Sequence, residues 1–199
     1  MTPETPPAAP PARRSLWRLW PLWLIVVVGL APFVFSYLAY YTWQPAGRTH
    51  HGELQAQPLP EGALVLADGK PFRLEQLRGR WLLLMADEAR CDEACVRKLY
   101  ALRQLRLTQG KDAPRIERVW LLTDGREPPA ELLDEYAGTW VVRAAGSALL
   151  EGLAPAGTAR DFIYLVDPLG NLVVRYPREA EPRGIIKDLV RLLKTSRIG

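Results

Sequence analysis

The sequence has few of the residues that build common metal or disulfide frameworks. Its 199 residues include only two cysteines and two histidines, and the histidines are adjacent. Two cysteines exclude a disulfide-dense small domain and a four-cysteine zinc ribbon, and one histidine pair offers little to a histidine-rich metal site. The hydrophobic share of 48% and the charged share of 24% are those of a globular chain.

Positive charge is scarce outside the N-terminal segment. The formal net charge is +4, but residues 1–48 hold four arginines (Arg13, Arg14, Arg18 and Arg48) against Glu4. The remainder of the chain is therefore almost neutral. Nucleic-acid binding through counterion release needs a dense cationic face, so we expect no nucleic-acid partner.

Charged residues are absent between positions 19 and 47. Within this stretch, a run of about 20 mostly apolar residues is long enough to cross roughly 30 Å of hydrocarbon, with Trp and Tyr at both ends as at membrane interfaces. We predict a transmembrane anchor helix over residues 19–43, after a disordered, proline-rich tail over residues 1–18. A cleaved signal peptide is the rival interpretation, but the run is long for one and no small-x-small cleavage site follows it. A buried core helix is disfavoured by the absence of charge.

The arginines also predict the orientation of this anchor. Arg13, Arg14 and Arg18 precede the apolar run, whereas Arg48 alone follows it closely. The positive-inside rule then places the N-terminus in the cytoplasm. We expect a single-pass protein of the inner (plasma) membrane, with its C-terminal domain in the periplasm, where disulfides can persist.

The C-terminal part reads as one soluble domain. Residues 44–62 contain several prolines and both histidines and are interpreted as a linker, which leaves residues 63–199 for the domain. Alternating or continuous apolar runs predict strands at 63–67, 70–74, 81–86, 118–122, 141–143, 162–166 and 172–175, and helical spacing predicts helices at 93–109, 128–137 and 182–194. This order indicates an α/β sandwich with a central mixed sheet.

The constellation with the clearest reactive potential is the pair Cys91 and Cys95. It lies where the buried strand 81–86 ends and the helix 93–109 begins, and open α/β sheets place their sites at such strand ends. Helical N–H groups would favour a thiolate at Cys91, although charges of both signs surround it. Three intervening residues put the sulfurs about one helical turn apart, close enough for a disulfide or for joint binding of Cu(I). Two unrelated cysteines, one of them a small buried hydrophobe, are the alternative.

Other polar residues have weaker claims to function. His50 and His51 could ligate a metal, but solvated linker residues are the simpler interpretation. Asp124 follows a strand end and could face the same rim as the cysteines, or it could cap the next helix. Asp167 precedes Pro168 in a hairpin signal and is interpreted as a turn residue.

Several segments together resemble the thioredoxin-like superfamily, which includes peroxiredoxins and membrane-anchored thiol reductases. The frame at 66–86, LADGKPFRLEQLRGRWLLLMA, followed by a cysteine pair at a helix start, is typical of it. The CxxxC spacing of Cys91 and Cys95 resembles that of the Sco/SenC proteins. The segments 122–137 and 163–171 are similar to the Sco patterns SVDPxRDTPxxLxxYA and YLIDPxG. The resemblance covers roughly residues 60–195 and implies a thioredoxin-like fold.

The resemblance also implies a function. Sco proteins bind copper and act as thiol-disulfide reductants in assembling the dinuclear copper centre of cytochrome c oxidase. Their ligands are the two CxxxC cysteines and a histidine about eight positions before the Asp of YLIDP. Counting back from Asp167 reaches Ala159, and no histidine follows His51. Asp92 and Glu93 also replace the prolines usual between the family's cysteines.

The resemblance and the exported dithiol lead to three hypotheses. The first is a membrane-anchored, Sco-like thiol-disulfide oxidoreductase that assists cytochrome c oxidase assembly, with Cys91 as the attacking thiolate, Cys95 as the resolving thiol and no required cofactor. The second is a non-enzymatic Cu(I) metallochaperone that uses the same two cysteines as metal ligands. The third is a redox-silent assembly scaffold. The expected partners are the membrane and an oxidase subunit or another copper or thiol assembly protein.

Overall fold

A computed structural model describes residues 20–42, 52–154 and 158–196, with the side chains of residues 39–42 excepted. The chain divides into two compact units, Met1–Gly47 and Arg48–Gly199. Helix α1 (Trp20–Thr42) is the described element of the first unit, and it is long and apolar enough to cross a membrane. Its bounds lie one residue inside the predicted anchor at each end. Pro32 lies within it, as membrane helices allow.

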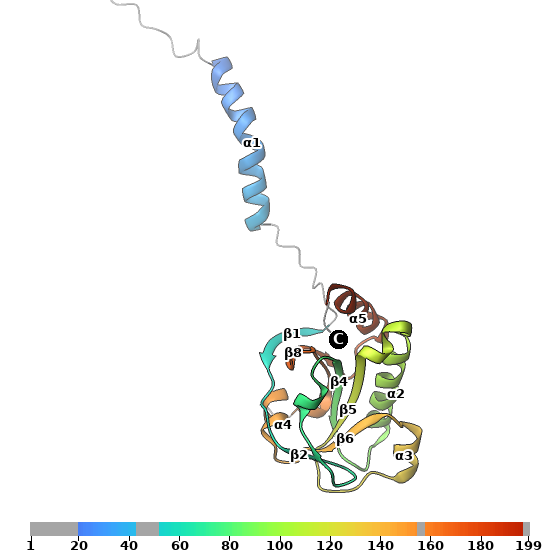
Figure 1. Ribbon diagram of the computed structural model, residues 1–199. Coiled ribbons are helices and arrows are strands. Elements are labelled where there is room, and N and C mark those ends of the chain that lie inside the picture. Colours follow the sequence, from blue (N-terminus) through green and yellow to red (C-terminus); the bar gives the residue numbers. More distant parts are fainter. Residues whose placement is uncertain (1–19, 43–51, 155–157, 197–199) are drawn as a thin grey trace, which may run out of the picture. The chain divides into compact units, whose positions relative to one another are not determined.

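The second unit alternates strands and helices around one sheet (Figure 1). The strands are β1 (Glu53–Pro58), β2 (Leu64–Leu66), β3 (Pro71–Phe72), β4 (Trp81–Asp87), β5 (Ile116–Leu122), β6 (Thr139–Arg143), β7 (Phe162–Val166) and β8 (Asn171–Pro177). The α-helices are α2 (Glu93–Leu107), α3 (Ala130–Glu135), α4 (Ala148–Leu153) and α5 (Pro182–Thr195), and the short 3-10 helices are η2 (Leu74–Leu77), η3 (Gly110–Arg115) and η4 (Ala159–Asp161).

The sheet is mixed, in the order β1-β8-β7-β4-β5-β6-β2-β3. Strands β4, β5 and β6 run parallel, whereas β7 pairs antiparallel with β4 on the other side. All seven residues of β4 and all seven of β5 are buried, as expected for central strands covered on both faces. The predicted α/β architecture with a central mixed sheet is confirmed.

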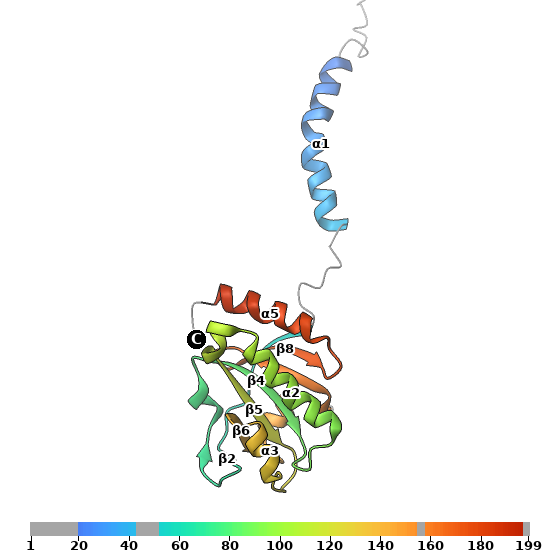
Figure 2. The same cartoon turned by 90° about the vertical axis from the view of Figure 1, so that its right-hand side faces the viewer.

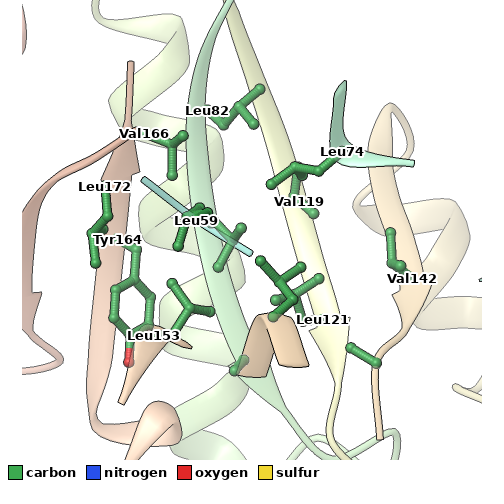
Figure 3. Close-up of a cluster of buried hydrophobic side chains, with 14 of the residues drawn as sticks. Leu59, Leu74, Leu82, Val119, Leu121, Val142, Leu153, Tyr164, Val166 and Leu172 are labelled. Carbon is green, nitrogen blue, oxygen red and sulfur yellow. The ribbon is translucent and has the colours of Figure 1, made fainter. Parts of the chain in front are cut away.

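Each face of the sheet carries its own hydrophobic cluster. Helices α2 and α5 cover one face (Figure 2). The buried cluster on that face includes Leu83, Met85 and Trp120 of the sheet. The opposite cluster is built from the alternate residues of the same strands, including Leu82 and Leu84, together with α4 and Tyr164 of β7 (Figure 3). Because strand side chains alternate between faces, the apolar run of β4 supplies both clusters.

Two sequence-based interpretations need correction or extension. The linker predicted at 44–62 is wrong over 53–58, because these residues form β1, an edge strand paired with β8. An edge position accommodates Pro58, whose missing N–H would break a central strand. Helix α4 was not predicted, since its six residues follow Ser147 without a long periodic pattern; the Ser147 side chain accepts a hydrogen bond from the Leu150 N–H. The predicted disordered tail and both histidines lie outside the described residues.

Candidate functional site

The two cysteines meet at the carboxyl end of β4. Cys91 and Cys95 form a disulfide, with an S–S distance of 2.05 Å and a Cα–Cα distance of 5.0 Å. Cys91 is partly buried, whereas Cys95 is fully buried in the α2 face of the core. The spacing argument therefore predicted the meeting of the sulfurs, and the two sulfurs differ in exposure as expected for an outer and an inner partner.

Local sequence features shape the segment between β4 and α2, residues 88–92, which we call the cysteine loop. The Cys91 N–H donates to the Glu88 carbonyl across 3.1 Å, which closes a turn. Cys91 itself has a φ of 42°, in the left-handed region that non-glycine residues seldom adopt. Asp92 then caps α2, because its side chain accepts a 2.9 Å hydrogen bond from the Cys95 N–H. The hydrogen bond ties Cys95 to the loop that carries Cys91.

The capping interaction also tunes the acidity of Asp92. The hydrogen bond from the Cys95 N–H lowers the pKa of the Asp92 carboxyl, the nearby positive charges of Arg160 and Lys98 act in the same direction, and burial opposes them. Asp92 is therefore held in its charged form next to the disulfide. Among the two acidic residues between the cysteines, it is the one with a structural role; Glu93 pairs with Arg97 at the exposed surface.

A buried ionic cluster lies directly behind the cysteine loop. The Asp87 carboxylate, at the end of β4, accepts from Lys98 Nζ at 2.8 Å through Oδ2 and from Arg160 Nε at 2.8 Å through Oδ1. The Lys98 ammonium also donates to the carbonyl oxygens of Ala86 at 3.0 Å and Arg160 at 2.7 Å. The side chains of Lys98 and Asp87 are only 2% and 3% exposed. Every proton of this buried ammonium therefore has an acceptor, as a buried charge requires.

The pKa shifts of the two cations reflect these surroundings. Burial lowers the pKa of Lys98, and the hydrogen bond and negative charge of Asp87 partly offset that effect. Burial would lower the pKa of Arg160 as well, but the negative charges of Asp87 and Glu88 outweigh it, so the pKa is raised. Asp87 thus favours the charged state of the buried Lys98, whereas the Arg160 guanidinium is charged in any surroundings.

The structure also places the two remaining candidate residues, Asp124 and Asp167. Asp124 faces the same rim as the cysteines, because its Oδ1 accepts a 3.0 Å hydrogen bond from the Ala89 N–H in the cysteine loop. It does not cap α3, where Pro129 occupies the cap position. Asp167 accepts from the N–H groups of Leu169 and Asn171, as predicted for a turn residue.

Sequence reasoning missed Asp87, Lys98 and Arg160. Two of them carried a signal. Lys98 follows Cys95 by three positions, on the side of α2 that also carries the buried Leu99 and Leu102. A lysine on that face needs a buried acid, and Asp87 terminates the apolar run of β4. No sequence pattern connects Arg160 to Asp87, 73 positions away, or to Lys98, 62 positions away.

The donors near the disulfide do not fit the three-ligand copper site that the resemblance implies. Cys91 and Cys95 offer thiolates only after reduction. Within residues 52–154 and 158–196, no group of three His, Cys, Asp or Glu side chains is arranged to hold a metal ion. The position counted for the third ligand holds Ala159, which has no donor side chain, and Arg160 beside it brings a fixed positive charge.

Comparison with known proteins places this site in a family. Residues 81–196 match the family model described as the transmembrane-like, thioredoxin-like, C-terminal domain. The chain belongs to this family. The matched segment begins with β4 and contains both cysteines and the whole ionic cluster. No curated protein matches the chain.

Solved structures with the same fold include several Sco proteins. Yeast Sco1 with copper bound is 18% identical over 71% of this chain and 96% of its own, with a TM-score of 0.59. Bradyrhizobium japonicum ScoI with copper bound is 20% identical over 67% of this chain and 98% of its own, with a TM-score of 0.51. BsSco, a Sco-family cytochrome c oxidase assembly protein with a disulfide switch, is 14% identical over 73% of this chain and 98% of its own, with a TM-score of 0.55. The predicted resemblance to Sco proteins is confirmed for the fold.

Proposed function

We propose that the protein is a membrane-anchored, Sco-like thiol-disulfide oxidoreductase that assists cytochrome c oxidase assembly through Cys91 and Cys95. The observation that carries the proposal is the disulfide itself, at the carboxyl end of β4, with one partly buried and one fully buried sulfur. BsSco, which has the same fold and is named as a member of a family of cytochrome c oxidase assembly proteins with a disulfide switch, supports the same role. Helix α1 supports the anchor.

The chemistry needs no cofactor. In the reduced protein, the Cys91 thiolate attacks a disulfide of the target protein, forms a mixed disulfide and releases one target thiolate. The Cys95 thiolate then attacks the Cys91 sulfur, which closes the protein disulfide and releases the second target thiolate. The target gains two electrons, and a separate dithiol reductant must restore the protein. The greater exposure of Cys91 supports its role as the attacking residue.

The predicted orientation completes the proposal. With the N-terminus in the cytoplasm, the dithiol domain lies in the periplasm, where a copper subunit of the oxidase would present its own cysteine pair. A cysteine pair with this role must be able to cycle between its dithiol and disulfide states in that compartment. The proposed target is therefore the oxidised cysteine pair of a copper site before the metal enters.

Thiol counting after redox equilibration tests the proposal. The full-length chain in detergent is poised against mixtures of reduced and oxidised glutathione, quenched with an alkylating reagent and weighed by mass spectrometry. Closure of the disulfide removes two hydrogens, about 2 Da, and protects both sulfurs from the reagent. We expect half of the protein to be oxidised at a redox potential that lies within or below the range covered by the glutathione mixtures. Two freely alkylated thiols under fully oxidising conditions would refute the redox role.

Carriage of Cu(I) is the second candidate, since yeast Sco1 and the Bradyrhizobium japonicum protein are solved with copper bound. Two thiolates can hold Cu(I) without a third ligand. The test is an anaerobic Cu(I) titration of the reduced chain against a competing chelator. Tight binding that is lost in Cys91→Ser supports a carrier, and an unchanged chelator signal excludes it. The redox-silent scaffold is excluded or supported by the complementation experiment described in the Discussion.

A further inference from the structure

The cysteine loop is held at both ends by one side chain from a distant part of the chain. Arg160 lies in η4, immediately before β7, and its guanidinium reaches three carboxylates. Its Nε contacts Asp87 Oδ1 at 2.8 Å, its Nη1 contacts Glu88 Oε1 at 2.6 Å, and its Nη2 lies 3.8 Å from Asp92 Oδ2. Asp87 and Glu88 precede Cys91, and Asp92 follows it directly.

The planar guanidinium is suited to this task. It presents its N–H groups in a rigid fork, so Nε and Nη1 hydrogen-bond the carboxylates of Asp87 and Glu88 while Nη2 forms a longer ion pair with Asp92. The Arg160 side chain is 40% exposed, whereas that of Asp87 is 3% exposed, so the contact to Asp87 anchors the fork in the protein interior. Lys98 holds the backbone of Arg160 in place, because its ammonium donates to the Arg160 carbonyl oxygen at 2.7 Å.

Cys91 requires such support. Its φ of 42° belongs to a region that costs free energy for any residue with a side chain, and such conformations persist where the surroundings hold them. Reduction of the disulfide removes the covalent link between Cys91 and Cys95, whereas the contacts of Arg160 involve neither sulfur and so do not depend on that link.

We infer that Arg160 is a positioning residue of the redox pair, whose guanidinium clamps the cysteine loop in the geometry in which Cys91 and Cys95 close their disulfide. This inference rests on the proposed function. It also gives a role to a cation beside Ala159, where the Sco resemblance implies a metal ligand. The site is thereby built to favour sulfur–sulfur bond formation over a third bond to copper.

The clamp has a thermodynamic consequence. In the exchange with glutathione, the protein dithiol gives two electrons and two protons to oxidised glutathione; the Cys91–Cys95 bond forms, the glutathione disulfide bond breaks, and two molecules of reduced glutathione result. A reduced loop that is already held in place loses less freedom when the disulfide closes, so the clamp raises the equilibrium constant for this oxidation. Loss of the clamp lowers that constant and makes the protein a weaker reductant.

The test is the equilibrium constant for oxidation by glutathione disulfide at pH 7, measured on the full-length chain in detergent. We expect Arg160→Gln to lower it about tenfold, which corresponds to about 30 mV. Arg160→Lys keeps the charge but not the fork, and we expect it to behave like Arg160→Gln. Glu88→Ala removes the shortest contact while leaving the Asp87 contact in place, and we expect a smaller decrease, about threefold. This variant keeps the test valid if the arginine variants do not fold.

Arg178→Gln is the matched control. Arg178 lines the same polar cleft as Arg160, but it pairs with Asp161 and Glu179 and with no residue of the cysteine loop. We expect its equilibrium constant to equal that of the unaltered chain. Unchanged equilibrium constants in the Arg160 and Glu88 variants would overturn the inference. An unchanged equilibrium constant in Arg160→Lys alone would also overturn it, because the positive charge of residue 160, and not the geometry of its guanidinium, would then determine the constant. Failure of the unaltered chain to form the disulfide would instead refute the proposed function.

Discussion

The buried pair of Lys98 and Asp87 predicts a large loss of stability when one partner is removed. Both side chains are almost inaccessible, with exposures of 2% and 3%, and their charged atoms are 2.8 Å apart. Lys98→Met deletes the ammonium and leaves the Ala86 and Arg160 carbonyls without that donor, while Asp87 keeps only Arg160 as its cation. Removing one partner of a buried pair costs about 3–5 kcal/mol.

The magnitude is measurable by urea unfolding of the full-length chain in detergent, followed by circular dichroism. With a urea dependence of about 2 kcal/mol per molar, a loss of about 4 kcal/mol moves the midpoint by about 2 M. Arg97→Met is the control, because Arg97 forms an ion pair of 2.6 Å with Glu93 at the surface, where the side chains are 65% and 89% exposed. An exposed pair of this kind contributes about 0.5 kcal/mol or less.

The double variant Asp87→Leu/Lys98→Met separates the charge from the packing. It removes the buried anion along with the cation, so we expect it to recover part of the stability lost in Lys98→Met. The reasoning would be refuted if Lys98→Met and Arg97→Met shifted the urea midpoint equally. The same conclusion would follow if the double variant were no more stable than Lys98→Met.

Further predictions concern the helix cap, the core and the topology. Asp92→Ala should destabilise the domain by about 1 kcal/mol, because the Cys95 N–H loses its acceptor. The pKa of Asp92 is lowered in the folded protein, so its charge stabilises the fold at pH values above the ordinary pKa of about 3.9, and this stabilisation is lost as the pH falls through the pKa of the folded state. The difference in unfolding free energy between the unaltered chain and Asp92→Asn should therefore shrink on acidification. A difference that does not change with pH would contradict this prediction. Leu102→Ala, at a site 1% exposed, should cost about 2–5 kcal/mol in urea unfolding, whereas Leu107→Ala, at a site 55% exposed on the same helix, should cost far less; equal costs would show that α2 packs differently. A membrane-impermeant maleimide should label the reduced protein in intact spheroplasts, because the proposed orientation places the dithiol domain outside the cytoplasm. Labelling that occurs only after lysis would contradict this orientation.

Regular hydrophobic patterns made most of the fold predictable. The continuous apolar run at 81–86 and its counterpart at 118–122 predicted the buried central strands, and helical spacing predicted α2 and α5. Strand β1 could not be predicted, because an edge strand buries few side chains and its burial alternates only weakly. Its stability comes from pairing with β8, which is remote in the sequence.

The candidate site, like the fold, was only partly predictable from the sequence. The cysteines were predictable because their spacing and their place between strand and helix are local features. The buried ammonium of Lys98 could have been suspected, since it interrupts an apolar helix face. Arg160 could not, because its three carboxylate partners lie in a segment that only the folded sheet brings next to η4.

Complementation tests the central claim most directly, that the sulfur chemistry of Cys91 and Cys95 is the function. In a strain that lacks the gene, the unaltered chain and a Cys91→Ser/Cys95→Ser variant are expressed at equal membrane levels, and cytochrome c oxidase activity is measured. The account predicts that the unaltered chain restores activity and the double variant does not. Full restoration by the double variant would contradict it and identify the domain as a scaffold.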